Sequence, residues 1–140
     1  MPRRLRFWSD ERGTTAVEFA MVVSLLLALT LGAINMSLVL FAQSALHFAV
    51  DDAARCMSVK TACNVSTLIG GVPTLVPNNT LTINYAKASY QGPNIGVSFT
   101  PNAAQACGNQ VTGTGTYNLN AVVGDFPITL NAQACYPVSS

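Results

Sequence analysis

An uninterrupted apolar run near the N-terminus constrains this sequence more than any other feature. No Asp, Glu, Lys or Arg occurs between Glu18 and Asp51, and the densest part, Phe19 to Ala42, has 24 residues. As a helix this part is roughly 36 Å long, which is enough to cross the hydrocarbon core of a bilayer. A chain of 140 residues has no second core large enough to bury such a run. The sequence therefore predicts a transmembrane helix with a span at about residues 19–42.

A few small or polar residues interrupt the run, and they allow two interpretations. Hydroxyl and amide side chains can bond back to helix carbonyls, and glycine lets another helix approach closely. A single span can tolerate such residues, or they can form a packing face for a partner helix, and both readings stay open. The residues concerned are Ser24, Thr30, Gly32, Asn35 and Ser37.

The charges that flank the run predict its orientation. Four arginines precede the span, whereas only Arg55 and Lys60 follow it at some distance. Because cytoplasmic flanks are enriched in Lys and Arg, the N-terminus is expected to stay in the cytoplasm and the C-terminal part to be translocated. The four arginines are Arg3, Arg4, Arg6 and Arg12.

Three processing outcomes are compatible with this arrangement. A secretory signal peptide has an apolar region of about 7–15 residues, which is shorter than this run, although Ala42-Gln43-Ser44 offers a weak cleavage site. An uncleaved anchor is the second outcome. The third outcome is cleavage on the cytoplasmic side of the run, where Gly13 and Glu18 lie. An acidic residue is costly as it nears hydrocarbon, so Glu18 is expected to be kept there for a reason.

The residues at this edge resemble a known family. The stretch Gly13-Thr14-Thr15-Ala16-Val17-Glu18-Phe19 resembles the cleavage signature of type IV prepilins. Continued to Ala53-Ala54-Arg55, the chain is similar to the TadE-like proteins of tight-adherence (Tad/Flp) pilus systems. This resemblance covers about the first 60 residues. The chain departs from most prepilins at Thr14, where those proteins favour Phe or Met.

The resemblance implies a role for three residues. Gly13 would precede the bond cut by a prepilin peptidase, and Thr14 would become the new N-terminus. Glu18 would neutralise the α-amino group of a neighbouring subunit, because opposite charges attract strongly in a low-dielectric bundle and an unpaired one is costly there. The alternative for Glu18 is a simple interfacial position with its carboxylate in water.

After the span, the pattern changes twice. Residues 43–60 have apolar positions at helical spacing, which predicts that the helix continues and presents an apolar stripe. From Thr61 onward the sequence is rich in Asn, Thr, Gly, Ser and Pro, which favours strands and turns. We expect turns at 70–73 and 77–79, strands at 80–89, 95–100, 116–123 and 126–136, and a tight turn at Gly124-Asp125 joining the last two.

All four cysteines lie on the side of the span that is expected to be translocated. A β-domain below 80 residues has a limited core and benefits from covalent links. Four cysteines allow three pairings, of which Cys56 with Cys63 and Cys107 with Cys135 is preferred only slightly, because these are neighbours in the sequence. Each link would contribute roughly 2–4 kcal/mol to the free energy of unfolding.

The sequence gives no support for catalysis, metal binding or nucleic-acid binding. The segment from Thr61 onward has no His or Glu, and only Lys87 and Asp125 are charged, so no nucleophile–base pair or carboxylate pair can be built there. The cysteine spacings do not fit a zinc site. A net charge of +1 and a small basic cluster argue against nucleic acid. We expect no catalytic residue, no metal and no cofactor.

The sequence as a whole predicts an α+β membrane protein, and the resemblance implies that it lies in the bacterial inner membrane. Residues 1–13 form a cytoplasmic leader, residues 14–60 a long N-terminal transmembrane helix that continues out of the membrane, and residues 61–140 a small extracytoplasmic antiparallel β-domain with disulfides. The resemblance implies a minor pilin or pseudopilin in assembly of a Tad-type pilus. Its partners would be the prepilin peptidase, other pilins, the inner-membrane assembly platform and membrane lipid. The alternative is an uncleaved, membrane-anchored extracytoplasmic binding module.

Overall fold

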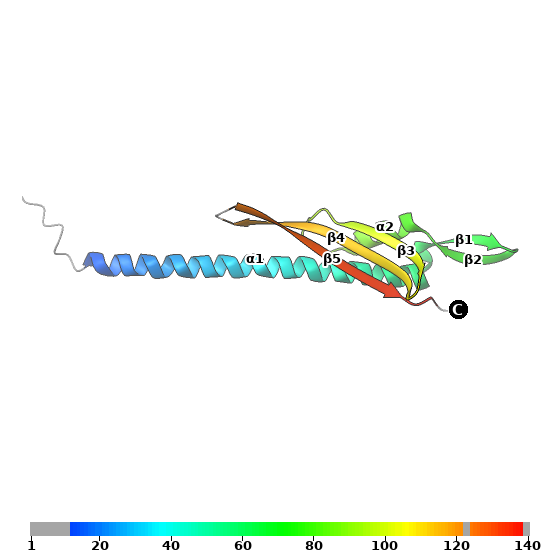
Figure 1. Cartoon of the computed structure of the whole chain (residues 1–140), viewed down its shortest axis with the longest axis horizontal. Helices are drawn as coiled ribbons and strands as arrows, with labels where there is room; N and C mark the ends of the chain where they lie inside the picture. Colours follow the sequence, from blue (N-terminus) through cyan, green and yellow to red (C-terminus); the bar gives the residue numbers. More distant parts are fainter. Residues whose placement is uncertain (1–11, 122–123, 139–140) are drawn as a thin grey trace, which may run out of the picture. The chain divides into compact units, whose positions relative to one another are not determined.

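The computed structural model describes residues 12–121 and 124–138, and the leader expected at residues 1–13 lies almost wholly outside them. Helix α1, Arg12–Val59, is one continuous α-helix (Figure 1). The chain divides into two compact units, Met1–Ser37 and Leu38–Ser140, so α1 contributes to both.

In the N-terminal unit, α1 exposes its apolar side chains. Phe19 is 71% exposed and Leu29 is 64% exposed, and the segment has a mean hydropathy of 2.3 over its most apolar window. This helix is long and apolar enough to cross a membrane. Apolar side chains exposed at this density are expected where lipid, rather than protein, is the surrounding medium.

The C-terminal unit contains the second half of α1, a second helix and two antiparallel sheets (Figure 1). A 3-10 turn η1, Thr61–Cys63, leads into a hairpin of β1, Asn64–Ile69, and β2, Val72–Pro77. Helix α2, Asn79–Ser89, follows. The second sheet is a meander of β3, Ser98–Gln105, β4, Gly108–Ala121, and β5, Gly124–Tyr136. The predicted α+β fold class is therefore confirmed.

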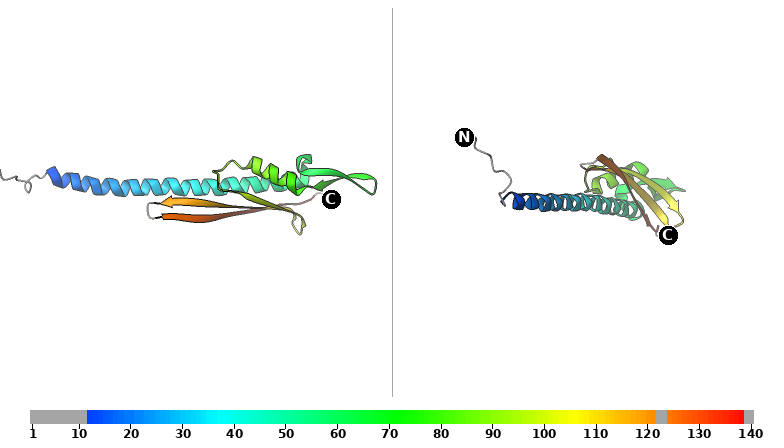
Figure 2. Two further views of the ribbon diagram at one scale, coloured as in Figure 1. Left: turned by 90° about the horizontal axis from the view of Figure 1, so that it is seen from above. Right: turned by 60° about the vertical axis from the view of Figure 1, so that its left-hand side comes forward.

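The core of this unit lies where α1 meets the three-stranded sheet. The predicted apolar stripe of α1 is buried, with Leu46, Ala49, Val50, Ala53 and Met57 each at most 1% exposed. Sheet and α2 both lie along this half of α1, and their own buried side chains complete the core (Figure 2). These are Phe99, Val111, Leu130 and Ala132 from the sheet and Ala86 from α2.

Two disulfides link the unit in the sequential pairing that the sequence analysis preferred. Cys56–Cys63 ties the last turn of α1 to η1. Cys107–Cys135 joins the β3–β4 connection to the end of β5. Both close loops within the C-terminal unit, where an oxidising compartment would keep them formed.

The strand expected at 80–89 is wrong, because this segment is helix α2. The side chain of Asn78 accepts a hydrogen bond from the Leu81 backbone N–H at 3.0 Å and so caps the helix. The buried residues are Thr82 and Ala86, which are spaced by four as a helix face requires, and the alternation of Leu81, Ile83 and Tyr85 does not decide the structure.

Other strand limits also differ from the expectation. The predicted turn at 70–73 is present at Gly70 and Gly71, whose φ angles of 63° and 83° suit a type I′ turn, but the β1–β2 hairpin around it was not predicted. The strand expected at 95–100 begins only at Ser98. The β4–β5 hairpin is present, but Gly124 and Asp125 belong to β5, where they pair with Ala121 and Asn120. Residues 122–123 between the strands lie outside the described residues.

Candidate functional site

The residues predicted for processing and register lie together in the first turns of α1. Gly13, Thr14 and Glu18 are all exposed, and Thr14 and Glu18 are spaced by four, so they share one face of the helix. The Gly13–Thr14 peptide bond lies in the first described turn of α1. Gly13 also has the low helix propensity of glycine. A glycine at this position lowers the free energy needed to open the helix locally at this bond.

The polar side chains inside the apolar segment make their hydrogen bonds within α1. Ser24 donates to the Met21 carbonyl at 2.8 Å, and Thr30 donates to the Leu27 carbonyl at 3.0 Å. The Asn35 amide donates to the Leu31 carbonyl at 3.0 Å. These bonds lower the free-energy cost of placing the hydroxyl and amide groups in hydrocarbon, so this part of the helix can face lipid although it carries polar side chains.

Gly32 has open space beside it that a partner helix can use. A Cβ built there would meet nothing within 4 Å. Within the described residues of the N-terminal unit, no other element covers this part of α1. The geometry is compatible with close helix approach and does not decide between lipid and a partner helix.

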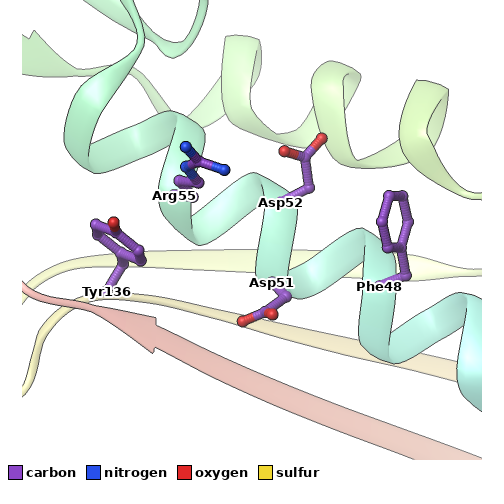
Figure 3. A pocket seen from close by; sticks show the side chains of 5 residues that line it. All are labelled: Phe48, Asp51, Asp52, Arg55 and Tyr136. Atoms are coloured by element: carbon purple, nitrogen blue, oxygen red, sulfur yellow. The ribbon is translucent and has the colours of Figure 1, made fainter.

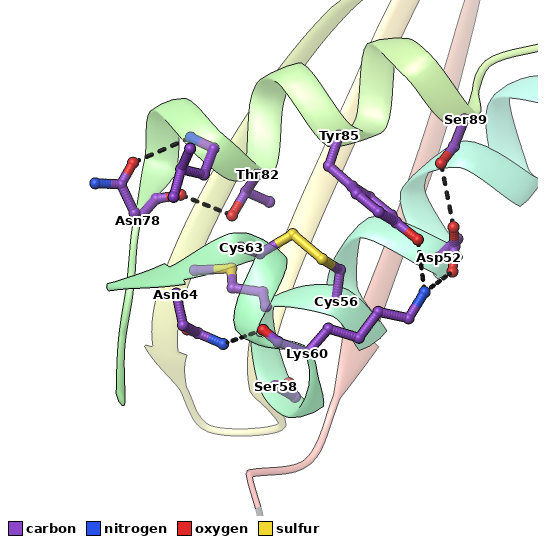
Figure 4. Close-up of a disulfide and its surroundings, with 12 residues drawn as sticks. Asp52, Cys56, Ser58, Lys60, Cys63, Asn64, Asn78, Thr82, Tyr85 and Ser89 are labelled. Atoms are coloured by element: carbon purple, nitrogen blue, oxygen red, sulfur yellow. Dashed lines mark hydrogen bonds and ion pairs between the residues drawn. A yellow bond between two sulfur atoms is a disulfide. The ribbon is translucent and has the colours of Figure 1, made fainter. Parts of the chain in front are cut away.

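Where α1 ends, a polar cluster attaches it to α2 (Figure 4). Lys60 Nζ donates to Asp52 Oδ1 at 3.0 Å and to the Tyr85 hydroxyl, and it lies 4.9 Å from the centre of the Tyr85 ring. Ser89 donates to Asp52 Oδ2 at 3.1 Å. The sequence analysis missed this cluster, because Asp52 and Lys60 are eight residues apart and their partners come from a segment predicted to be a strand.

The cluster shifts the acid–base equilibria of both charged groups. The hydrogen bonds that Lys60 donates to the Tyr85 hydroxyl and to Asp52 raise the pKa of Lys60. Burial acts to raise the pKa of Asp52, but its hydrogen bonds with Lys60, Tyr85 and Ser89 outweigh this, and the pKa of Asp52 is lowered. Both shifts favour the charged pair, which holds the end of α1 in place.

A shallow groove on α1 carries charged residues (Figure 3). Phe48, Asp51, Asp52 and Arg55 line it from α1, and Tyr136 lines it from β5. Asp51 and Asp52 are adjacent in sequence and their carboxylates point apart, so they do not form a pair suited to acid–base catalysis (Figure 3). Among the described residues, no group of three or more His, Cys, Asp or Glu side chains is placed to hold a metal ion.

Comparison with known proteins gives one match. The model of the TadE-like protein family matches residues 13–55. The matched range begins at Gly13 and ends within α1 at Arg55, so it contains Thr14, Glu18 and the whole predicted span. No curated protein and no solved structure matches the chain. The family is associated with pili and is not a class of enzymes, in agreement with the resemblance noted from the sequence.

Proposed function

From its TadE-like segment at residues 13–55, we propose that this chain is a minor pilin or pseudopilin that acts in assembly of a Tad-type pilus. The observation that carries the proposal is the start of the match at Gly13, in the first turn of an apolar helix that can cross a membrane. A prepilin peptidase would cut after Gly13 on the cytoplasmic side, and Thr14 would become the N-terminus. The C-terminal unit would lie in the periplasm until assembly.

Glu18 is proposed to set the register of neighbouring helices. After cleavage, the α-amino group of Thr14 carries a positive charge and the carboxylate of Glu18 a negative one, one helical turn apart on the same face. In a bundle of apolar helices, each charge is stabilised when the opposite charge of a neighbour lies beside it. The exposed apolar side chains of residues 19–37 then supply the packing surface toward other pilins.

The first experiment determines the N-terminus and intact mass of the protein from membranes, with and without the prepilin peptidase. A peptidase-dependent start at Thr14 supports the proposal. A start at Met1 or Pro2 means an uncleaved anchor, and a start near Ala45 means a secreted domain, and either result contradicts it. Gly13→Leu should abolish the start at Thr14, whereas Gly32→Leu is a matched control, because both glycines lie in α1 with nothing within 4 Å of a built Cβ.

A second experiment separates assembly from processing. Glu18→Gln keeps the size of the side chain but removes its charge. Normal membrane insertion and cleavage with loss of pili is the expected result. Asp51→Asn removes an exposed charge from the same helix and should leave piliation unchanged. Normal pili with Glu18→Gln would refute the register role while leaving the processing result intact.

A further inference from the structure

Strands β1 and β2 form a separate two-stranded sheet whose apolar side chains are exposed on both faces (Figure 1). On one face Leu68 is 72% exposed and Leu75 is 50% exposed, and on the other face Ile69 and Val72 are exposed. No charged residue occurs in either strand. A hairpin of two strands is at best marginally stable in water on its own. This hairpin therefore has the properties of a segment that a further strand would stabilise.

The hydrogen-bond pattern of the hairpin identifies the backbone groups of β1 that point away from β2. At the base of the hairpin, the Asn78 N–H donates to the Cys63 carbonyl at 2.9 Å, so these two residues form a hydrogen-bonded pair. In an antiparallel ladder such pairs alternate with pairs that are not hydrogen-bonded to each other. The hydrogen-bonded pairs in this register are therefore Val65 with Val76, Thr67 with Thr74 and Ile69 with Val72.

The residues of β1 between these positions present their backbone groups at its outer edge. They are Asn64, Ser66 and Leu68. The Asn64 N–H is used within the chain, because it donates to the Thr61 carbonyl. Ser66 and Leu68 each keep an N–H and a C=O that no other strand of the described chain reaches. These groups form a short row of alternating donors and acceptors along the edge of β1.

The prolines of the C-terminal unit agree with this pattern and single out β1. Pro73 lies opposite Leu68, and Pro77 lies opposite Asn64. Each proline therefore stands where a backbone N–H would point outward from β2, so it keeps the ladder intact and removes a donor from the outer edge. Of the four edge strands in the described part of the chain, β1 alone has no proline. The prolines are Pro73 and Pro77 in β2, Pro101 in β3 and Pro127 in β5.

We propose that the outer edge of β1 binds an extended, uncharged strand of another protein chain. A peptide strand satisfies the backbone groups of Ser66 and Leu68 at their own spacing, whereas acyl chains of lipid would leave them unpaired. Because β1 has no charge, nothing on it would compensate a charged partner, and its apolar side chains would lie beside those of the added strand. The proposal goes beyond the proposed function, since it requires neither cleavage after Gly13 nor a pilus.

The test measures amide hydrogen exchange by NMR on the oxidised, isotope-labelled full chain in a non-ionic detergent. The probe is a synthetic peptide with the sequence of residues 64–69, capped at both ends, because it is itself an uncharged strand without proline. Without the peptide, we expect fast exchange at Ser66 and Leu68 and slow exchange at Thr67, whose N–H is bonded to β2. A peptide concentration about ten times the dissociation constant should slow exchange at Ser66 and Leu68 about tenfold.

Two proline variants of the full chain form a matched pair. Ser66 and Leu75 are cross-strand neighbours, and their N–H groups point outward at opposite edges of the hairpin. Ser66→Pro should abolish the slowing at Leu68, whereas Leu75→Pro should leave it unchanged. Exchange at Thr67 reports whether the hairpin is intact in each variant. If Ser66→Pro loses the protection at Thr67, Ser66→Lys, which places a charge on the same edge, takes its place.

Three results would overturn the proposal. No slowing at Ser66 and Leu68 with about 1 mM peptide would mean that the edge does not bind a strand. Equal slowing at Leu68 in the unmodified chain and in the Ser66 variant would place the peptide elsewhere. Protection at Ser66 and Leu68 that is present without peptide and grows with protein concentration would assign the edge to a second copy of this chain. None of these results depends on cleavage after Gly13, so the proposed function is tested separately.

Discussion

The close approach of β4 to α1 makes Gly113 a position where a small change should have a measurable effect on stability. A Cβ built on Gly113 would lie 2.7 Å from Val50 Cγ1, 3.0 Å from Leu46 Cδ1 and 3.1 Å from Phe99 Cε1. The end of the Leu46 side chain can rotate away, but the β-branched side chain of Val50 has little rotamer freedom in a helix. Overpacking of this kind typically costs about 1–3 kcal/mol.

A smaller effect acts in the opposite direction. Replacing glycine by alanine restricts the unfolded chain and stabilises a protein by about 0.4–1 kcal/mol where the backbone conformation allows it. The φ angle of Gly113 is not in the left-handed region, so this gain applies. We therefore expect Gly113→Ala to lower the free energy of unfolding of the C-terminal unit by about 0.5–2 kcal/mol.

The measurement is guanidinium unfolding of the oxidised full chain in a non-ionic detergent, followed by tyrosine fluorescence. Val50→Ala alone should also destabilise, because Val50 is completely buried. In the double variant, the room left by Val50 accommodates the new methyl group, so the two costs should be clearly less than additive. Additive costs, or no cost for Gly113→Ala, would refute the close contact as the cause.

Two further predictions concern the links that hold the unit together. Replacing both Cys107 and Cys135 by Ser should lower the free energy of unfolding by about 3.6 kcal/mol from loop entropy, against about 2.4 kcal/mol for Cys56 and Cys63, because the sequence separations are 28 and 7. Equal costs in denaturant unfolding would contradict this explanation. The stabilisation from Asp52 and Lys60 should be fully present between about pH 4 and pH 10.5. In acid it should be lost as the pH drops through the lowered pKa of Asp52. In base it should be lost as the pH rises through the raised pKa of Lys60. Lys60→Met should flatten both limbs of the stability–pH curve, whereas Lys87→Met, an exposed control on α2, should leave them unchanged.

The sequence predicts the parts of this fold that depend on long patterns. The span and the apolar stripe from Leu46 to Met57 extend over many helical turns, so each residue supports the same interpretation. The β4–β5 hairpin is similarly supported by alternation in two strands. Segments of about ten residues have no such redundancy, and residues 80–89 satisfy a strand pattern and a helix pattern equally well.

Tertiary contacts decide such ambiguous segments. In α2, the cap from Asn78 and the burial of Thr82 and Ala86 favour the helix. Asn directly before the segment and the helix formers Ala86, Lys87 and Ala88 near its end are the sequence signals that point the same way. The cluster of Asp52 and Lys60 could not be predicted while α2 was taken for a strand, since Tyr85 and Ser89 reach it from one helix face.

Hydropathy alone cannot locate the outer membrane boundary on α1, because the helix changes its surroundings without changing its composition. Charged residues are absent as far as Asp51, yet Ala42, Leu46 and Ala49 are already buried against protein. These apolar residues match the sheet, not lipid. We therefore expect the span to end before the sheet begins to cover α1, at the latest at Val39, which packs against the core. A span from Glu18 to Leu38 still supplies the roughly 20 residues that a bilayer requires.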